Sequence, residues 1–435
     1  MKGLPFLPLL ALALALALAL AGSAGGADVS PALPSLPDRS FNLREFGAAG
    51  DGHTLDTAAL QKAIAAVDAA GGGTLEVPAG AYLTGPFDLC SRLNLHLDAG
   101  ATLLFSQKFE DYRLGEKKYR PLIGAKNCHD LEISGSGTLD GQGSPWWAAE
   151  WKVKRAARKA GQHDAEIGRP RMIILDGCQR VLLRGITLQN PPMYHFVPVR
   201  CEDVTVDGIT IHSPADSPNT DGIDPSVSRR VLIEHCTIDT GDDCIAIKAG
   251  PKGFGPVEDV LITDCTFRHG HGCSIGSDTN SGVRRVLVRR CTFEDTDIGV
   301  RLKSRRTRGG DVEDITYTDL HMNRVGQAIV ISSYYYDLPG PGEHDQPKPV
   351  DADTPIWRNI LVRNIVAVNG TRDAGLIIGL PEMPARDIRL ENVSIEAPRG
   401  LRIAYTEGIT LRNVSIRPAK GPALLVEDTV SGLKQ

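Results

Sequence analysis

Four short polar motifs recur at nearly even intervals between Asn219 and Lys303. They are NTDGID (219–224), GDD (241–243), HGHG (269–272) and RLK (301–303). Three acids of the first two motifs, Asp221, Asp242 and Asp243, are the candidates for acid–base chemistry. Glycoside hydrolysis needs two carboxyl groups in different states, one to protonate the leaving oxygen and one to activate water. Crowding acids together raises the pKa of at least one of them, because like charges do not ionise cheaply side by side.

The last two motifs add basic side chains. Arg301 and Lys303 are two residues apart, so on a strand both point to the same side. Such a pair beside acids suits an anionic sugar such as a uronic acid, although a salt-bridged surface is the alternative. His269 and His271 could share a metal, but no further ligand stands at metal-binding spacing. We therefore expect no metal, and we expect His271 to hydrogen-bond an acid or the substrate.

Each motif alone is more often an ordinary turn, so the elements that position all four decide the interpretation. The apolar pattern V-x-[ILV]-x-x-[CVIL]-x-[ILF] begins at Val181, Val204, Val231, Val260, Val286, Ile315, Ile360, Ile388 and Ile409, with a weaker copy at Leu131. The first six starts differ by 23, 27, 29, 26 and 29 residues, which is a solenoid period. Alternating apolar residues indicate strands, and the GD, DG and SP dipeptides between them indicate turns. The sequence predicts an all-β fold, a parallel β-helix whose motifs stack along one groove.

The N-terminus carries an export signal in this interpretation. Lys2 precedes an unbroken Leu and Ala run to about Ala21 and then AGSAGGA, which predicts a signal peptide and linker over 1–27, with a membrane anchor as the alternative. No later stretch is long and apolar enough to span a bilayer. We expect a secreted or periplasmic monomer that is not attached to a membrane. The net charge of -5 with mixed signs carries no nucleic-acid signature.

The mature chain is expected to form one continuous domain. Residues 40–105 are assigned to an N-terminal cap and the first strands, and 106–432 to the β-helix. Asp56 can cap a helix that Gly71 to Gly73 end, and its apolar stripe is Leu60, Ile64 and Val67. This helix would cover the first coil, whose edge groups would otherwise be unpaired. Residues 152–171 and 334–355 lack the strand pattern and are predicted to be loops that wall the groove.

Nine cysteines fall on a pattern that argues against disulfides. Six occupy two equivalent positions of the repeat, Cys236, Cys265 and Cys291 at one and Cys128, Cys178 and Cys201 at the other. Equivalent positions stack in columns, so we expect two ladders of small buried thiols. No pairing is assigned to Cys90, Cys244 and Cys273.

These residues resemble glycoside hydrolase family 28, the polygalacturonases, which are right-handed parallel β-helices. The motifs that carry the resemblance follow the family order: FGAAGDG, VPAGAYLTGP, GSGTLDGQGSPWW, SPNTDGIDP, TGDDCIAIK, GHGCSIGS and GVRLKS. The resemblance implies inverting hydrolysis of α-1,4-galacturonosyl linkages in pectin or polygalacturonate, with no cofactor. The cysteine pattern is similar to bacterial members, since the fungal members carry disulfides.

The same resemblance implies residue roles. Asp242 would be the general acid, with an acidic pH optimum, and Asp221 and Asp243 would activate the water. His271 would support the protonation of the acid. The residues expected to bind sugar are Asn219, Arg301, Lys303 and Tyr335, the last with Tyr334 and Tyr336 as competitors. Adjacent strand residues point to opposite faces, so the backbone must bend near Gly241 for Asp242 and Asp243 both to reach substrate.

Three other functions stay open at this point. A rhamnogalacturonan or other pectic-oligosaccharide hydrolase of the same family would be expected to lack the Arg-x-Lys pair, which is present. A pectate lyase would need Ca²⁺ and a cationic base and would release an unsaturated product. A non-catalytic carbohydrate-binding β-helix is disfavoured because all three acids are present. The choice between internal cleavage and trimming of chain ends depends on the loops and is left open.

Overall fold

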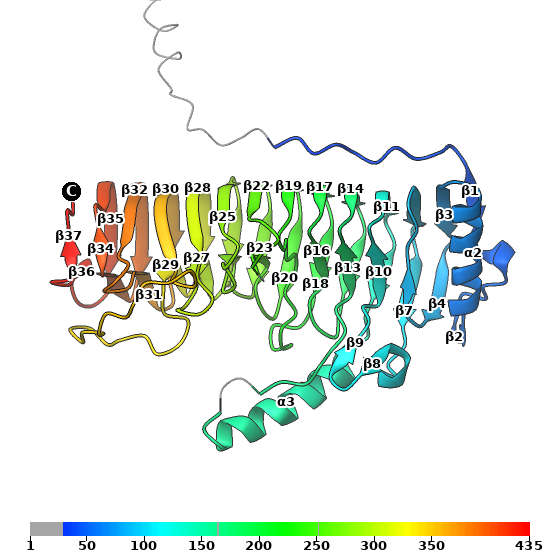
Figure 1. Cartoon of the computed structure of the whole chain (residues 1–435), viewed down its shortest axis with the longest axis horizontal. Helices are drawn as coiled ribbons and strands as arrows, with labels where there is room; N and C mark the ends of the chain where they lie inside the picture. Colours follow the sequence, from blue (N-terminus) through cyan, green and yellow to red (C-terminus); the bar gives the residue numbers. More distant parts are fainter. Residues whose placement is uncertain (1–28, 163–164, 251) are drawn as a thin grey trace, which may run out of the picture.

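The structure, a computed structural model, describes residues 29–162, 165–250 and 252–435. The signal peptide and linker predicted over 1–27 lie outside the described residues. Short strands stack side by side along one long axis (Figure 1), and they form a parallel β-helix as the repeat predicts. Within the described ranges, no helix is long and apolar enough to cross a bilayer.

Three ladders of parallel strands run along the molecule. The first contains β1 (Ser40–Asn42), β3 (Gly73–Val77), β6 (Leu93–Leu97), β11 (His129–Gly135), β14 (Gln179–Arg184), β17 (Glu202–Asp207), β19 (Arg229–Glu234), β22 (Val257–Thr263), β25 (Val283–Arg289), β28 (Asp311–Asn323), β30 (Ile356–Val368), β32 (Ala385–Ala397) and β35 (Thr410–Pro418). The second contains β2 (Asp51–Leu55), β4 (Gly80–Thr84), β7 (Ala101–Phe105), β12 (Thr138–Asp140), β15 (Thr187–Gln189), β18 (Thr210–His212), β20 (Thr237–Thr240), β23 (Thr266–His269) and β26 (Thr292–Glu294), and it joins the first at the long β28.

The third ladder lies beside the first three polar motifs and contains the fourth. It contains β5 (Phe87–Asp88), β10 (Ile123–Lys126), β13 (Ile173–Asp176), β16 (Phe196–Val199), β21 (Ile245–Ile247), β24 (Cys273–Ile275), β27 (Ile298–Lys303), β29 (Gln327–Ser332), β31 (Asp373–Ile378), β33 (Arg399–Ala404) and β36 (Leu424–Val426). Single bridges from Ile223 to Phe196 and to Ile245 connect β16 with β21. Two short strands, β34 (Thr406–Glu407) and β37 (Val430–Ser431), extend β32, and β8 (Arg113–Gly115) pairs antiparallel with β9 (Lys118–Tyr119).

The apolar repeat marks the first ladder in register. Val204 pairs with Val181 on one side and with Val231 on the other, and the same position continues through Val260, Val286 and Ile315. These side chains are buried. Because side chains alternate along a strand, this register places every second apolar residue inside one continuous core.

A helix covers the N-terminal end of the coils. It is α2 (Thr57–Ala69), and the predicted stripe of Leu60, Ile64 and Val67 is buried against the first strands. The predicted capping by Asp56 is wrong in its detail. Its carboxylate accepts hydrogen bonds from the backbone N–H groups of Ala49 at 2.7 Å and Gly50 at 3.1 Å, and none from the helix. The Asp56 carboxylate therefore binds the backbone of residues 49 and 50, and it is not used to cap the helix.

The prediction of a loop over 152–171 is partly wrong. A second helix, α3 (Ser144–Lys159), projects from one side of the coils (Figure 1). It is anchored by Trp147 and Trp151, whose indole N–H groups donate to the carbonyls of Pro191 and Asp216. The segment 334–355 contains no strand or helix, as predicted.

The cysteines form the two columns that the repeat predicts. All nine are thiols, with Cys265 between Cys236 and Cys291 in one column and Cys178 between Cys128 and Cys201 in the other. Cys128 lowers the pKa of Cys178, but Cys201 and burial outweigh it and raise this pKa to about 12, so Cys178 stays protonated and unreactive.

We expect reducing agents to leave the thermal midpoint of the purified protein unchanged. The reason is that packing of thiols, and no covalent bridge, holds these columns together. Thiol titration of the denatured, unreduced protein should give all nine cysteines. Fewer than nine titratable thiols, together with a midpoint that falls on reduction, would contradict the prediction.

The residue just before the start of each apolar repeat is usually charged, and these residues stack in a column from coil to coil. Its members are Asp130, Arg180, Asp203, Arg230, Asp259, Arg285 and Asp314, followed by Asn359 and Asp387. All have positive φ values of 51 to 58°, so the corner is the same on each coil. Arginine donates to the aspartate of the preceding coil at 2.7, 2.7 and 2.6 Å in the three successive pairs. Opposite charges therefore alternate from coil to coil.

Candidate active site

The four polar motifs lie on successive coils of the third ladder. NTDGID contains the bridge residue Ile223, GDD ends just before β21, HGHG ends just before β24, and RLK ends β27. The parallel pairs Ile245–Cys273 and Cys273–Val300 align these coils. GDD and HGHG occupy the same place just before their strands, and RLK lies on the adjoining strand, where Arg301 pairs with Ser274. The side chains of the motifs therefore meet at one face.

Asp243 lies at the centre of the cluster and is 1% exposed. Its Oδ2 accepts from Lys303 Nζ at 2.6 Å, and its Oδ1 accepts from Arg301 Nη1 at 3.0 Å. Ser274 Oγ donates to the same Oδ1 at 2.8 Å. Burial raises the pKa of Asp243, but Lys303 and Arg301 outweigh it and hold the pKa well below its usual range. Both cations thus point toward the acids, and this carboxylate is ionised with both oxygens engaged.

Asp242 is paired with the histidine of the next coil. His271 Nδ1 lies 3.2 Å from Asp242 Oδ1, and the side chain of Asp242 is 23% exposed. The backbone bends at Gly241 and Asp242, so that Asp242 and Asp243 reach one cavity as expected. Burial raises the pKa of Asp242, but the hydrogen bond and charge of His271 outweigh it, so the net shift is downward.

Asp221 is the acid whose pKa rises. Burial raises it well above the ordinary value, and the charges of Asp224 and Asp242 add to the effect. Its Oδ2 accepts from Lys248 Nζ at 3.1 Å, whereas its buried Oδ1 has no hydrogen-bond partner among the described residues. The expectation that crowding raises one pKa is met in the free protein at Asp221 and not at Asp242, because His271 stands beside Asp242.

Two charged residues of this cluster were not singled out from the sequence. Lys248 Nζ lies 3.2 Å from Asp224 Oδ2 and 5.1 Å from the centre of the Tyr194 ring. Asp224 is fully buried, and burial, partly offset by Lys248, raises its pKa to about 6. The signal was a charged side chain at the end of each of two motifs, NTDGID and TGDDCIAIK.

The α3 insert forms the wall next to NTDGID. Asn219 Oδ1 accepts from Lys154 Nζ at 2.8 Å and from Arg169 Nη2 at 2.6 Å. Buried Glu150 balances these cations, 3.3 Å from Lys154 and 3.4 Å from Arg169. The amide oxygen of Asn219 is therefore committed to the wall, and only its amide nitrogen stays available to a sugar.

The segment 334–355 forms the wall beyond RLK. Tyr335 lines the cavity, and its ring centre lies 5.5 Å from Lys303 Nζ. The hydroxyl of Tyr334 donates to Asp345 at 2.8 Å. Tyr336 lines the same cavity as Tyr335. The cavity has a volume of about 430 Å³, and six of the eight predicted site residues line it: Asn219, Asp221, Asp242, Asp243, Lys303 and Tyr335. His271 and Arg301 contact the acids from the side.

Comparison with known proteins decides the family. Residues 69–415 match the sequence model described as Glycosyl hydrolases family 28. The chain belongs to glycoside hydrolase family 28. Residues 40–94 also match the description Rhamnogalacturonase A/epimerase, pectate lyase-like.

The alignments of this family 28 protein with its relatives cover most of its length. A probable polygalacturonase from Vitis vinifera is 31% identical over 416 residues, covering 88% of this chain and 81% of that protein. The solved hyperthermoactive exopolygalacturonase from Thermotoga maritima is 30% identical with a TM-score of 0.76, covering 89% of this chain and 94% of its own. The family 28 exopolygalacturonase from Yersinia enterocolitica is 25% identical with a TM-score of 0.74, covering 92% and 79%. The chain is thus a glycosidase of the polygalacturonase family, with its right-handed parallel β-helix fold.

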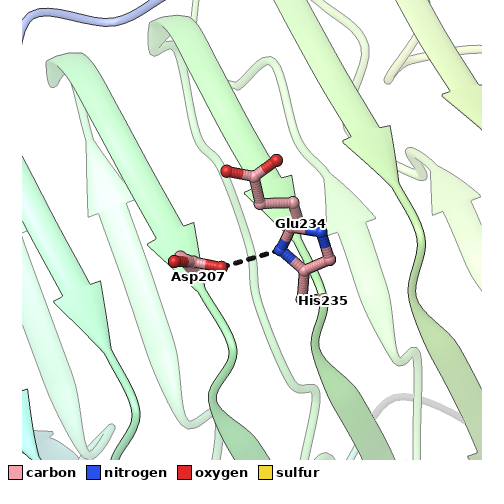
Figure 2. A group of neighbouring side chains, drawn as sticks. All are labelled: Asp207, Glu234 and His235. Carbon is pink, nitrogen blue, oxygen red and sulfur yellow. Dashed lines mark hydrogen bonds and ion pairs between the residues drawn. The ribbon is translucent and has the colours of Figure 1, made fainter.

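Among the described residues of the family 28 protein, two groups of side chains have the composition of metal ligands. The candidate ligand atoms of Asp242, Asp243 and His271 lie within 4.8 Å of one another, but Arg301 and Lys303 already neutralise Asp243. The second group, Asp207, Glu234 and His235, lies at the ends of β17 and β19 in the first ladder (Figure 2). There His235 Nδ1 lies 2.9 Å from Asp207 Oδ1, and both side chains are solvent-exposed. We assign no metal to either group.

Proposed function

We propose that the protein hydrolyses α-1,4-galacturonosyl linkages of de-esterified pectin or polygalacturonate by a single inverting displacement. One observation carries the proposal: a buried Arg and Lys contact the same acidic cluster that lines the cavity. Acids supply the chemistry of glycoside hydrolysis, and the cations match the carboxylate of a uronic acid. Membership of family 28 supports the same substrate class.

Asp242 acts as the general acid, and His271 supports it. Burial raises the pKa of Asp242, but His271, whose Nδ1 lies 3.2 Å from Asp242 Oδ1, holds it below its ordinary value in the free protein. A bound polyuronate brings negative charge next to Asp242, which raises the pKa of this carboxyl. Asp242 then takes up a proton and donates it to the leaving glycosidic oxygen. Activity is expected to be greatest in acid, because this proton is lost as the pH rises.

Asp221 and Asp243 activate the attacking water. Asp221 lines the cavity and keeps one oxygen without a hydrogen-bond partner among the described residues, and Asp243 is a fixed negative charge in the same cavity. Water attacks the anomeric carbon as the bond to the leaving oxygen breaks, and its proton passes to Asp221. Since the acid and the base stand on opposite faces of the sugar, the configuration at that carbon inverts.

Arg301 and Lys303 bind the galacturonate carboxylate, and Tyr335 packs against the sugar. The guanidinium and ammonium groups already point to one place, so little reorganisation is required when the sugar carboxylate arrives. The amide nitrogen of Asn219 donates to a sugar oxygen at the other end of the cavity.

We also propose that cleavage occurs at chain ends. The cavity meets Lys154 and Glu166 of the insert wall at one end and Tyr335 and Tyr336 at the other, which favours a short bound segment. The two solved relatives are described as exopolygalacturonases. Because the natural polymer lies outside the cell, we further propose that the chain is exported, to the periplasm or beyond, and acts as a monomer.

The test is an incubation of the mature protein with polygalacturonate and a chelator. We expect new reducing ends without ultraviolet absorbance, and small products of one size from the start. Products that are oligomers of mixed size would contradict cleavage at chain ends, but they would leave the proposed substrate and reaction unchanged. Rising absorbance would indicate a lyase. No reducing ends from polygalacturonate or short oligogalacturonides would overturn the substrate, and cleavage of rhamnogalacturonan would then favour the related hydrolase.

A further inference from the structure

Lys248 is a buried cation that the proposed mechanism does not use. It follows β21, and its backbone is bridged to the preceding coil, because its N–H donates to the carbonyl of Pro225 and its carbonyl accepts from the N–H of Val227. Its Nζ lies 3.1 Å from Asp221 Oδ2 and 3.2 Å from Asp224 Oδ2. Lys248 lines the cavity with only 18% of its side chain exposed, so its ammonium is held by the two carboxylates rather than free in solvent.

The charges around this ammonium explain why it is needed. Two buried carboxylates side by side repel each other and lose their hydration, which is costly unless a cation pairs with them. Burial lowers the pKa of Lys248, but Asp224 and Asp221 outweigh it and raise the pKa well above its ordinary value. Lys248 therefore stays charged while the acids titrate.

The contact also sets the orientation of Asp221. Its Oδ2 is held by Lys248, so the buried Oδ1 is left without a hydrogen-bond partner among the described residues, in a side chain that lines the cavity. Asp243 differs, because both of its oxygens accept hydrogen bonds from Arg301, Lys303 or Ser274. Among the described residues, Asp221 is thus the acid of this pair with one oxygen that accepts no hydrogen bond.

We infer that Lys248 is a positioning residue of the reaction, which keeps Asp221 ionised and holds its carboxylate in one orientation beside the cavity. The inference rests on the proposed function for the identity of the reaction. Asp224 is the second anchor of the ammonium and limits how far it can move toward the cavity. The charged or titratable groups that act on Asp221 are Asp224, Asp242, Asp243, Lys248, Tyr194 and Arg169. Those that act on Lys248 are Asp224, Asp221, Tyr194, Asp243 and Lys303.

The pH profile of Lys248→Met separates positioning from other roles. A base works when ionised, so activity is lost as the pH falls through the pKa of Asp221, and removal of the cation raises that pKa further. We expect the acid limb of kcat/KM to move up by about one pH unit or more, with kcat in acid lowered at least about tenfold. Lys248→Arg should restore most of the shift.

Other outcomes overturn the inference. A raised KM with an unchanged acid limb would make Lys248 a residue that binds a sugar carboxylate. A profile identical to that of the wild type would reduce it to packing. Asp224→Asn gives an independent check, because removal of this like charge lowers the pKa of Asp221 and should move the acid limb to lower pH. An acid limb that stayed in place or moved upward would contradict the inference.

A stability measurement tests the ionic part without substrate. Near pH 7 the Met variant leaves two buried carboxylates without their cation, so its thermal midpoint should fall below that of the wild type. Towards about pH 4 these acids, whose folded-state pKa values are raised, become protonated, and the wild type loses the pairing as well. The gap should therefore shrink as the pH falls, and a constant gap would overturn the inference. The double variant Lys248→Met/Asp224→Asn removes one charge of each sign, and it is the variant to use if Lys248→Met alone does not fold. Near pH 7 its thermal midpoint should be closer to that of the wild type than the midpoint of Lys248→Met is. This test holds even if polygalacturonate proves not to be the substrate.

Discussion

Replacement of Asp242 by Asn is expected to lower kcat on polygalacturonate by about a thousandfold or more. The amide cannot supply the proton that the leaving oxygen needs, which costs at least about 4 kcal/mol of transition-state stabilisation. The variant should fold normally, because the amide can still accept the hydrogen bond from His271. Steady-state kinetics across the pH range, together with the thermal midpoint, measure both effects.

The chain offers a matched control on the same coil. Asp239 has its oxygen 2.8 Å from His269 Nδ1, as Asp242 pairs with His271, yet it does not line the cavity. Asp239→Asn should therefore keep nearly all of the activity. If Asp242→Asn kept a tenth or more of the wild-type rate while Asp221→Asn was inactive, the two acids would have exchanged roles. The raised pKa of Asp221 makes this the informative alternative.

Replacement of Lys303 by Ala is expected to impair both binding and chemistry. The sequence alone predicts mainly weaker binding of uronate sugars. In the structure, however, Lys303 Nζ lies 2.6 Å from Asp243 Oδ2 and both side chains are buried, so the change also removes the partner of a catalytic carboxylate. Breaking a buried ion pair on one side costs about 3 to 5 kcal/mol. We expect a raised KM, a kcat lowered by about a hundredfold or more, and a lower thermal midpoint.

A surface lysine controls for the loss of charge. Lys252 is exposed and paired with Asp353 outside the cavity, so Lys252→Ala should change neither constant. If Lys303→Ala raised KM and left kcat and the thermal midpoint unchanged, its contact with Asp243 would be irrelevant to the reaction. An equal loss of rate on neutral glycosides would instead remove the proposed recognition of the sugar carboxylate.

The coil arrangement could be predicted because one repeat governs it. Each strand of the first ladder begins at the same position, so Asp243, His271 and Arg301 were expected on adjacent coils from their spacing alone. The α3 helix could not be predicted in this way, because its stability comes from contacts outside the repeat. Trp146, at its start, stacks on Phe109 with ring centres 3.6 Å apart, and no periodic pattern indicates that pairing.

The protonation states were also beyond the sequence. Spacing brings three acids together, but the order of their pKa values depends on which cation each one touches. Asp243 faces Lys303 and Arg301, Asp242 faces His271, and Asp221 is left with Lys248 shared with Asp224. The alternation of side chains along a strand predicts the direction of the Lys248 side chain. It does not predict that two carboxylates, those of Asp221 and Asp224, contact its ammonium group.

The alternating charges along the corner of the coils restrict how this β-helix can change in length. Between Asp130 and Arg285 the sign reverses at every coil, so the ladder repeats only every second coil. Insertion or deletion of one coil in this region would place aspartate on aspartate or arginine on arginine, and like charges would then repel each other at that contact. Two coils added together would preserve the pairing. Growth of this part of the molecule, by duplication or by design, is therefore favoured in even numbers of coils.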